Sequence, residues 1–164
     1  MDGIKVFQVV GYQNSGKTTL MEKLIAYGTS KSFRIGTIKH HGHGGAPDKN
    51  RVAKDSDRHR EAGAKFACVE GGGILHLEAQ QGSWSLDEII SLYKQFELDL
   101  VLVEGYKQAQ YPKIIMIREP EDLELVRELT NIHSIISWFP IEQPDNYQTF
   151  SIDELDRFVE EFFT

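Results

Sequence analysis

The chain has 164 residues, of which 40% are apolar and 26% are charged, and this composition is normal for a globular protein. Its length suits one well-buried core and is too short for two ordinary domains, so we expect a single domain over residues 1–164. A formal net charge of −7 argues against a general nucleic-acid or membrane-surface role, because anionic phosphates would be repelled.

The first part of the chain alternates strands with helices. Residues 4–10 are nearly all apolar, as expected of a strand buried on both faces of a parallel sheet. A glycine-rich loop follows, and apolar residues then recur at helical spacing up to a break at 28–32. Residues 33–40 predict a second strand, 40–54 a glycine-rich loop and 55–64 a short helix.

The same alternation continues to the end of the chain. Two alternating runs across a glycine turn at 71–73 predict a β-hairpin, in which Cys68 is expected to be a small buried hydrophobic residue. The other predicted elements are a helix over 85–96 capped by Ser85, strands over 99–105, 113–119 and 134–139, a short helix over 122–129 and a final helix over 152–163. This order indicates an α/β fold, with a mostly parallel central sheet flanked by helices and an added antiparallel hairpin.

The cysteine count and the hydropathy pattern bear on location. One cysteine cannot form an internal disulfide and suits a reducing compartment. The first residues lack a basic region followed by a long apolar run, and no stretch approaches the ~20 apolar residues needed to span a bilayer. We therefore expect a cytoplasmic protein with neither nucleic acid nor membrane as a partner.

The segment GYQNSGKT, residues 11–18, has the spacing G-x-x-x-x-G-K-[ST] and lies between a predicted strand and a helix, as a phosphate-binding P-loop requires. Two glycines permit the tight turn, and the amides that follow converge on phosphate at the positive end of the helix. Lys17 would reach the β- and γ-phosphates, and the Thr18 hydroxyl would bind Mg²⁺. The predicted nucleotide-binding residues are Gly11, Asn14, Ser15, Gly16, Lys17, Thr18 and Thr19.

A magnesium site also needs a carboxylate. Glu104 directly follows a buried strand and should lie at the carboxyl edge of the sheet, beside the P-loop. Asp55 is the other candidate, although Asp55 or Ser56 could instead cap the helix that follows. Asp99 precedes its strand and is therefore expected at the opposite edge.

Three histidines, His40, His41 and His43, lie in the glycine-rich loop after the second strand. They could capture a transition metal such as zinc or nickel, they could help bind a second phosphorylated ligand, or the loop could simply be solvated. The sequence does not decide among these readings. The candidate residues for a second ligand are Lys39, His40, His41, His43, Arg58 and Lys107.

Four segments occur in an order that resembles a known family: GYQNSGKTTL, GTIKHHGH, KDSDRHREAGA and LDLVLVEGYK. The resemblance is to the molybdopterin-guanine dinucleotide biosynthesis adapter proteins, which are P-loop GTPases. It implies GTP and Mg²⁺ as cofactors, with Asp55 and Glu104 where related members hold magnesium. It also implies molybdopterin cofactor and a molybdenum cofactor guanylyltransferase as partners, the latter performing the transfer of GMP. A homodimer with strands from the hairpin region extending across the pair is implied as well.

Some features leave alternatives open. The guanine-reading motif N-K-x-D is absent, so guanine specificity depends on the resemblance alone. No arginine or glutamine stands out by spacing as a catalytic group, so we expect at most slow GTP hydrolysis. A nickel or zinc metallochaperone GTPase and a small-molecule kinase or ligase remain alternatives. An apolar region, with Ile74, Leu75, Leu77 and Trp84, could form a dimer interface or could pack against the chain's own sheet.

Overall fold

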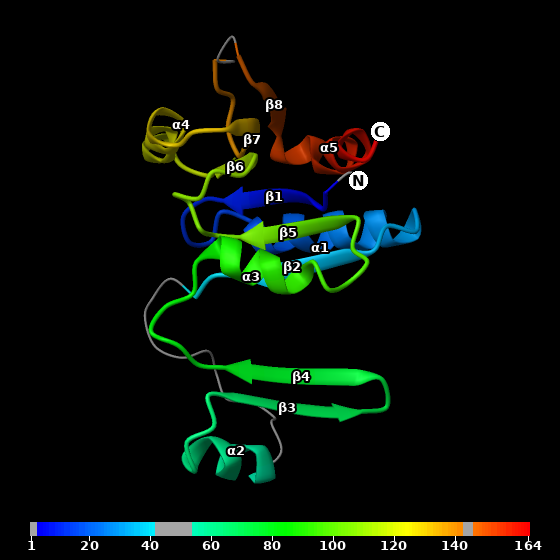
Figure 1. Ribbon diagram of the computed structural model, residues 1–164. Coiled ribbons are helices and arrows are strands. Elements are labelled where there is room, and N and C mark those ends of the chain that lie inside the picture. The colour runs from blue at the N-terminus through cyan, green and yellow to red at the C-terminus, as the bar shows by residue number, and fades with distance from the viewer. Residues whose placement is uncertain (1–2, 42–53, 143–145) are drawn as a thin grey trace.

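The computed structural model describes residues 3–41, 54–142 and 146–164. Figure 1 shows a central sheet with helices on both sides and a hairpin that lies apart from it. The central strands are β1 (Lys5–Val10), β2 (Ile35–Lys39), β5 (Leu100–Glu104), β6 (Lys113–Ile117), β7 (Ile132–Ser137) and β8 (Gln148–Ser151). The hairpin strands are β3 (Phe66–Gly71) and β4 (Ile74–Ala79).

Helices connect most of these strands. They are α1 (Lys17–Ser30), α2 (Lys54–Glu61), α3 (Leu86–Tyr93), α4 (Glu124–Glu128) and α5 (Leu155–Phe162), with 3-10 turns at Pro120–Leu123 and Ile152–Glu154. Ser85 caps α3 as predicted, because its hydroxyl accepts a hydrogen bond from the Glu88 amide while the Glu88 carboxylate accepts one from the Ser85 amide. In the described ranges, no helix has the length and apolar content needed to cross a membrane.

The central sheet has the strand order β2-β5-β1-β6-β7-β8, and every neighbouring pair is parallel. The expected α/β architecture is therefore confirmed. The sixth strand, β8, was not predicted. It has four residues, of which only Phe150 is buried, so its sequence carries too short an apolar pattern to indicate a strand.

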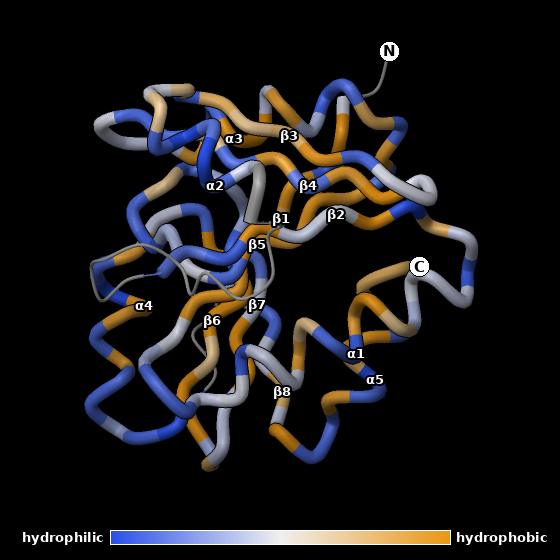
Figure 2. The backbone as a smooth tube through the Cα atoms, turned by 90° about the horizontal axis from the view of Figure 1, so that it is seen from below, coloured by the Kyte–Doolittle hydropathy of each residue, from blue (hydrophilic) through white to orange (hydrophobic). Residues whose placement is uncertain are grey.

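Alternate residues of the strands build a core on each face of the sheet. In β5, Leu100 and Leu102 pack in the cluster that contains α1 and α5, whereas Val101 and Val103 pack against α3. A third cluster joins β6 and β7 to Leu125 of α4. Figure 2 shows the hydrophobic residues concentrated along the central strands. Because both faces are covered, the carboxyl ends of the strands are left as the accessible edge for a ligand.

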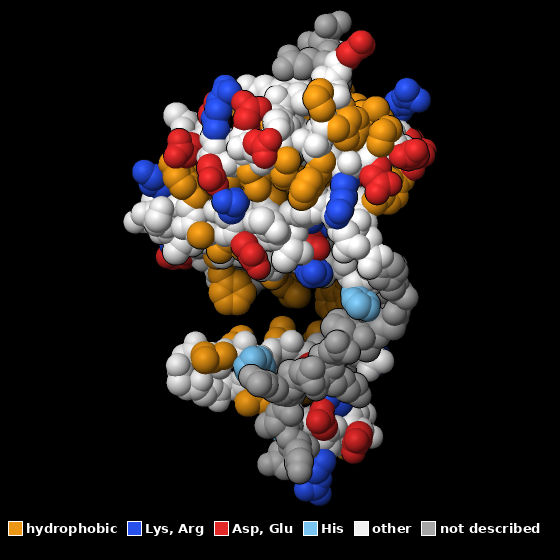
Figure 3. All heavy atoms as spheres, turned by 180° about the vertical axis from the view of Figure 1, so that it is seen from behind, with side chains coloured by type: hydrophobic (Ala, Val, Ile, Leu, Met, Phe, Trp, Pro, Cys, Tyr) orange, Lys and Arg blue, Asp and Glu red, His pale blue; other side chains and the backbone are white. Residues whose placement is uncertain are grey.

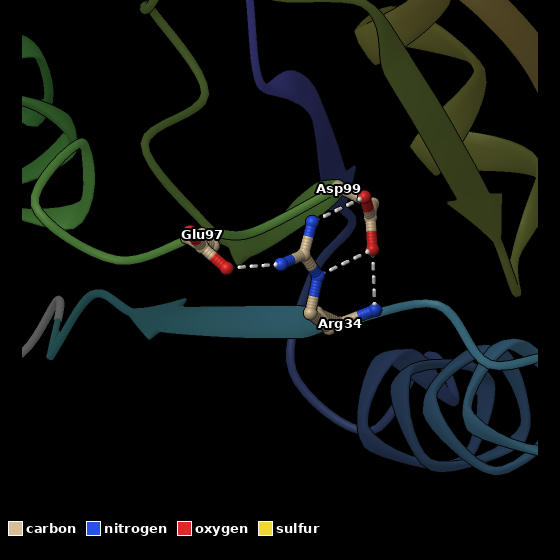
Figure 4. Close-up of polar contacts among 3 residues, drawn as sticks. All are labelled: Arg34, Glu97 and Asp99. Carbon is tan, nitrogen blue, oxygen red and sulfur yellow. Dashed lines mark hydrogen bonds and ion pairs between the residues drawn. The ribbon is translucent and has the colours of Figure 1, made fainter.

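The opposite edge carries a salt-bridge cluster instead. Asp99 precedes β5, and its carboxylate accepts hydrogen bonds from the Arg34 guanidinium at 3.1 and 3.2 Å and from the Arg34 amide at 2.8 Å, while Glu97 accepts a further bond from Arg34 at 2.8 Å (Figure 4). These hydrogen bonds hold the pKa of the Asp99 carboxyl below its ordinary value. The expectation that Asp99 lies at the edge of the sheet opposite the P-loop is thus confirmed.

The hairpin forms a two-stranded sheet of its own, which argues against one of the two alternatives for its apolar residues and contradicts the expectation for Cys68. Leu75 and Leu77 are 51% and 53% exposed, so they do not pack against the chain's own central sheet. Cys68 is exposed rather than buried, because the register pairs it with Leu77 on the same uncovered face. The alternating pattern that predicted the strands correctly says nothing about whether a second layer covers them.

Candidate functional site

The P-loop lies at the carboxyl end of β1 and opens α1. Gly16 is the residue before the helix and has φ 97°, and Asn14 also has a positive φ of 60°. A Cβ atom at Gly11 would lie 2.5 Å from the Ser15 Oγ and 2.9 Å from the Met116 main-chain oxygen, so only glycine fits there. The predicted phosphate cradle therefore has the tight turn that its function requires.

Lys17 is the first residue of α1, and its ammonium group folds back over the loop. The Nζ atom donates a hydrogen bond to the Tyr12 main-chain oxygen at 2.6 Å. Burial lowers the pKa of Lys17, Glu104 opposes this shift, and the positive charges of Lys107 and Lys39 add to it. A phosphate bound at this point would favour the charged form of Lys17 and would offset the repulsion from Lys107 and Lys39.

Glu104 ends β5 beside the P-loop strand, as predicted, with Val9 of β1 as its register partner. Its side chain is only 13% exposed and pairs with the Lys39 ammonium at 3.2 Å. A largely buried carboxylate that lines the same groove as Thr18 suits a hard cation such as Mg²⁺, which prefers oxygen ligands. The chemistry of this donor set therefore fits magnesium.

The loop after β5 is held by a residue that the sequence did not indicate. Gln8 is fully buried in β1, and its amide nitrogen donates to the main-chain oxygens of Gly105 and Tyr106 at 2.9 and 2.6 Å. This anchor positions Lys107, whose ammonium lies 3.8 Å from the centre of the Tyr12 ring. Burial also lowers the pKa of Lys107.

Tyr12, the ring under Lys107, is held by a hydrogen bond of its own. The Tyr12 hydroxyl donates to the Glu124 carboxylate, and this bond raises the pKa of Tyr12 to about 12.

Only part of the candidate second-ligand set comes together. Lys39, His40, His41 and Lys107 line the same groove as the P-loop, and the His40 ring lies 4.4 Å from the Tyr106 ring, centre to centre. Arg58 is instead an exposed residue of α2, which packs on β3 rather than on the central sheet. His43 lies outside the described residues.

The remaining magnesium candidate, Asp55, lies on α2. This helix begins at Lys54, so Asp55 and Ser56 are helical residues and neither is its cap. The side chain of Asp55 is not among those that the structure describes, and its role as a ligand stays a prediction. Within the described part of the chain, no group of three or more histidine, cysteine or acidic residues is placed to hold a metal ion.

The groove as a whole is open and positively charged. It has a volume of about 1520 Å³, and its charged lining among the described residues consists of Lys17, Lys39, Lys107, Arg118 and the carboxylate of Glu104. In this described lining cations outnumber acids, although the whole chain has a net charge of −7, and such a local excess of positive charge suits an anion. Arg118 and Trp138, which follow β6 and β7, were not predicted, and the only available signal was their position directly after two buried strands.

Comparison with known proteins supports the family resemblance that the order of the motifs indicates. The family profile described as molybdopterin guanine dinucleotide synthesis protein B matches residues 6–138. A probable molybdopterin-guanine dinucleotide biosynthesis adapter protein of Bacillus subtilis is 45% identical over 131 residues, which are 80% of this chain and 75% of that protein. An adapter protein of Haemophilus influenzae is 33% identical over 140 residues, or 85% of this chain and 78% of that protein.

Solved structures agree in fold. The crystal structure of Bacillus subtilis MobB superposes with a TM-score of 0.85 at 36% identity, covering 98% of this chain and 96% of that one. A MobB homologue from Bacillus stearothermophilus gives a TM-score of 0.79 at 39% identity, covering 96% of this chain and 94% of that one. The likeness extends over almost the whole chain, including the segments outside the P-loop.

Proposed function

The chain belongs to the molybdopterin guanine dinucleotide synthesis protein B family, and we propose from this membership that it is a GTP-binding adapter in the synthesis of that dinucleotide. The observation that carries the proposal is the cationic groove around the P-loop in an otherwise acidic protein. Such a groove suits a nucleoside triphosphate, because the phosphates are matched by amides, lysines and a helix N-terminus. The single cysteine is compatible with our placing this role in the cytoplasm.

In this proposal each part of the P-loop has a defined task. The amides of residues 14–19 surround the phosphates, and Lys17 leaves the Tyr12 carbonyl to pair with the β- and γ-phosphates. Thr18 and Glu104 hold Mg²⁺, with Asp55 as the further ligand implied by the family. When bound, the ion neutralises negative charge on the phosphates. The preference for guanine over adenine is inferred from the family alone, because none of the described groove residues indicates it.

We further propose that GTP hydrolysis by the chain alone is slow. A cation that could stabilise the transferring phosphate, Lys107, is already engaged, since it lies over the Tyr12 ring. In a single-turnover assay of the purified protein with Mg·GTP, we expect a rate below about 0.01 s⁻¹, as for GTPases that lack an external arginine. A rate in the kinase range of roughly 1–100 s⁻¹ without any partner would contradict this.

The second substrate in this proposal is the phosphorylated molybdopterin cofactor. The groove exceeds the ~300–1,000 Å³ of ordinary small-molecule sites, and Lys39, His40, His41 and Lys107 line it beyond the P-loop. A reconstituted reaction of molybdopterin cofactor, GTP and a guanylyltransferase should form more dinucleotide when this chain is added. Equal yields with and without the chain, under limiting guanylyltransferase, would refute the adapter role.

We also propose that the chain is a homodimer joined through the hairpin. The register places Phe66, Leu75 and Leu77 on one face of the hairpin, and these side chains are 61%, 51% and 53% exposed. The opposite face carries Glu78, which pairs with Arg60 of α2. A two-stranded hairpin is marginally stable without a covering layer, so its bare apolar face needs a partner.

The shape of the molecule supports a second copy in that place. Figure 3 shows a hollow between the hairpin and the rest of the molecule, with hydrophobic side chains on both surfaces that face it. The strand β2 ends the central sheet, and β4 is also an edge strand. Unpaired edges flanking an apolar hollow are favourable sites for strands from another chain.

A further inference from the structure

Trp138 directly follows β7 and lies against the P-loop. Its indole N–H donates to the Ser15 main-chain oxygen at 2.9 Å, and its ring approaches Gly16, where the position of an added Cβ would be 3.6 Å from Trp138 Cζ2. The side chain nevertheless remains 45% exposed and lines the groove. An indole with one edge fixed and much of its surface open to a ligand groove is suited to stacking.

Arg118 supports this arrangement from the neighbouring strand. It follows β6, which pairs in parallel with β7, so both residues leave the sheet at the same edge. Its guanidinium donates to the Asn14 carbonyl, and the guanidinium carbon lies 5.3 Å from the Trp138 ring centre. The Arg118 amide donates to the Asp122 carboxylate at 2.8 Å, which fixes the backbone at this point. Arg118 and Trp138 thus form one wall, each anchored to a different carbonyl of the P-loop.

The position of this wall relative to Glu104 indicates which part of a nucleotide it meets. Glu104, which would hold a magnesium ion close to the phosphates, lies on the β5 side of β1. The triphosphate end is therefore expected on the β5 side, while the nucleoside extends to the other side of β1. The first two strands on that side are β6 and β7, with β8 beyond them. Arg118 and Trp138 directly follow β6 and β7.

We infer that Trp138 is the base-stacking platform of the nucleotide site, with Arg118 as the positioning residue that holds it. This inference rests on the proposed binding of a nucleoside triphosphate at the P-loop. It supplies a contact for the purine in a groove where the usual guanine-reading motif is missing. Stacking on an aromatic ring tolerates any purine, so this wall adds affinity for the nucleoside without selecting guanine.

The test compares two ligands that share phosphates and differ in the base. Calorimetry would measure the binding of Mg·GTP and of magnesium tripolyphosphate to three proteins: the unmodified full chain, the Trp138→Ala variant and the Trp138→Phe variant. We expect Trp138→Ala to weaken the affinity for GTP by about tenfold or more. Its affinity for tripolyphosphate should stay within about twofold of that of the unmodified chain. Trp138→Phe should keep most of the GTP affinity, because a ring remains although the N–H to Ser15 is lost. Unchanged GTP affinity in Trp138→Ala, or equal losses for both ligands, would overturn the inference.

A second measurement avoids any effect of the alanine variant on folding. The chain has two tryptophans, so Trp84→Phe leaves Trp138 as the single indole reporter. Its fluorescence should change on addition of Mg·GTP and not of tripolyphosphate, and a bound GTP that leaves the emission unchanged would overturn the stacking. If the unmodified chain binds no GTP at all, the proposed function itself fails, which is a separate and recognisable result.

Discussion

Replacing Lys17 with alanine should remove detectable GTP binding in isothermal titration calorimetry. The ammonium group is the one P-loop side chain that carries charge to the β- and γ-phosphates, and its present partner is the Tyr12 carbonyl at 2.6 Å. Hydrogen bonds between charged groups contribute about 1.5–3 kcal/mol each, so the loss of two such bonds should weaken binding by at least about a hundredfold. Circular dichroism should show an unchanged fold, because Lys17 packs no core cluster.

Lys23→Ala is the matched control on the same helix. Lys23 pairs with Asp156 at 2.5 Å on the surface between α1 and α5, and it does not line the groove. The Lys23→Ala variant should therefore bind Mg·GTP with the affinity of the unmodified chain. If Lys17→Ala kept its affinity, or if both lysine variants lost it equally, the assignment of the phosphate site would be wrong.

Replacing Leu75 and Leu77 together with serine should convert the proposed dimer into a monomer. Both side chains lie on the uncovered face of the hairpin and contribute about half of their surface to solvent in the single chain. Fully burying a leucine contributes about 1.5–3 kcal/mol, and in a symmetric pair each substitution is counted twice. Sedimentation velocity at high micromolar concentration should therefore show a halved mass.

Ile74→Ser provides the control for this experiment. Ile74 is 61% exposed, but it neighbours Leu75 in the same strand and so points to the opposite face. This variant should remain dimeric. A monomeric unmodified chain, or a double variant that sediments like the unmodified chain, would show that the hairpin face is not the interface.

Local patterns made most of the fold predictable. The buried strands β1 and β5 are mostly apolar, with Gln8 interrupting the run in β1. The P-loop is recognisable from eight consecutive residues, because the motif is built from neighbouring amides and one lysine. The capping box at Ser85 is also local. By contrast, β8 is a strand because it pairs with β7, and its four residues have no sequence pattern from which that pairing could be predicted.

Outside the P-loop, the candidate site was predictable only where it depended on strand ends. Glu104 could be placed because parallel strands share a carboxyl edge. Gln8, Arg118 and Trp138 depend instead on which strands are neighbours, and the order β5-β1-β6-β7 is not written in any single segment. Cys68 was assigned to a core for a similar reason, since whether a hairpin face is covered depends on a layer elsewhere in the chain or in a partner.

The central claim is that a triphosphate lies in the cradle where β1 becomes α1. A crystal structure of the chain with Mg·GTP tests it most directly. We predict that the phosphates contact the amides of residues 14–19 and the Lys17 ammonium, with the ion between Thr18 and Glu104 and the base against Trp138. A nucleotide bound elsewhere, with Lys17 still on the Tyr12 carbonyl, would contradict the account.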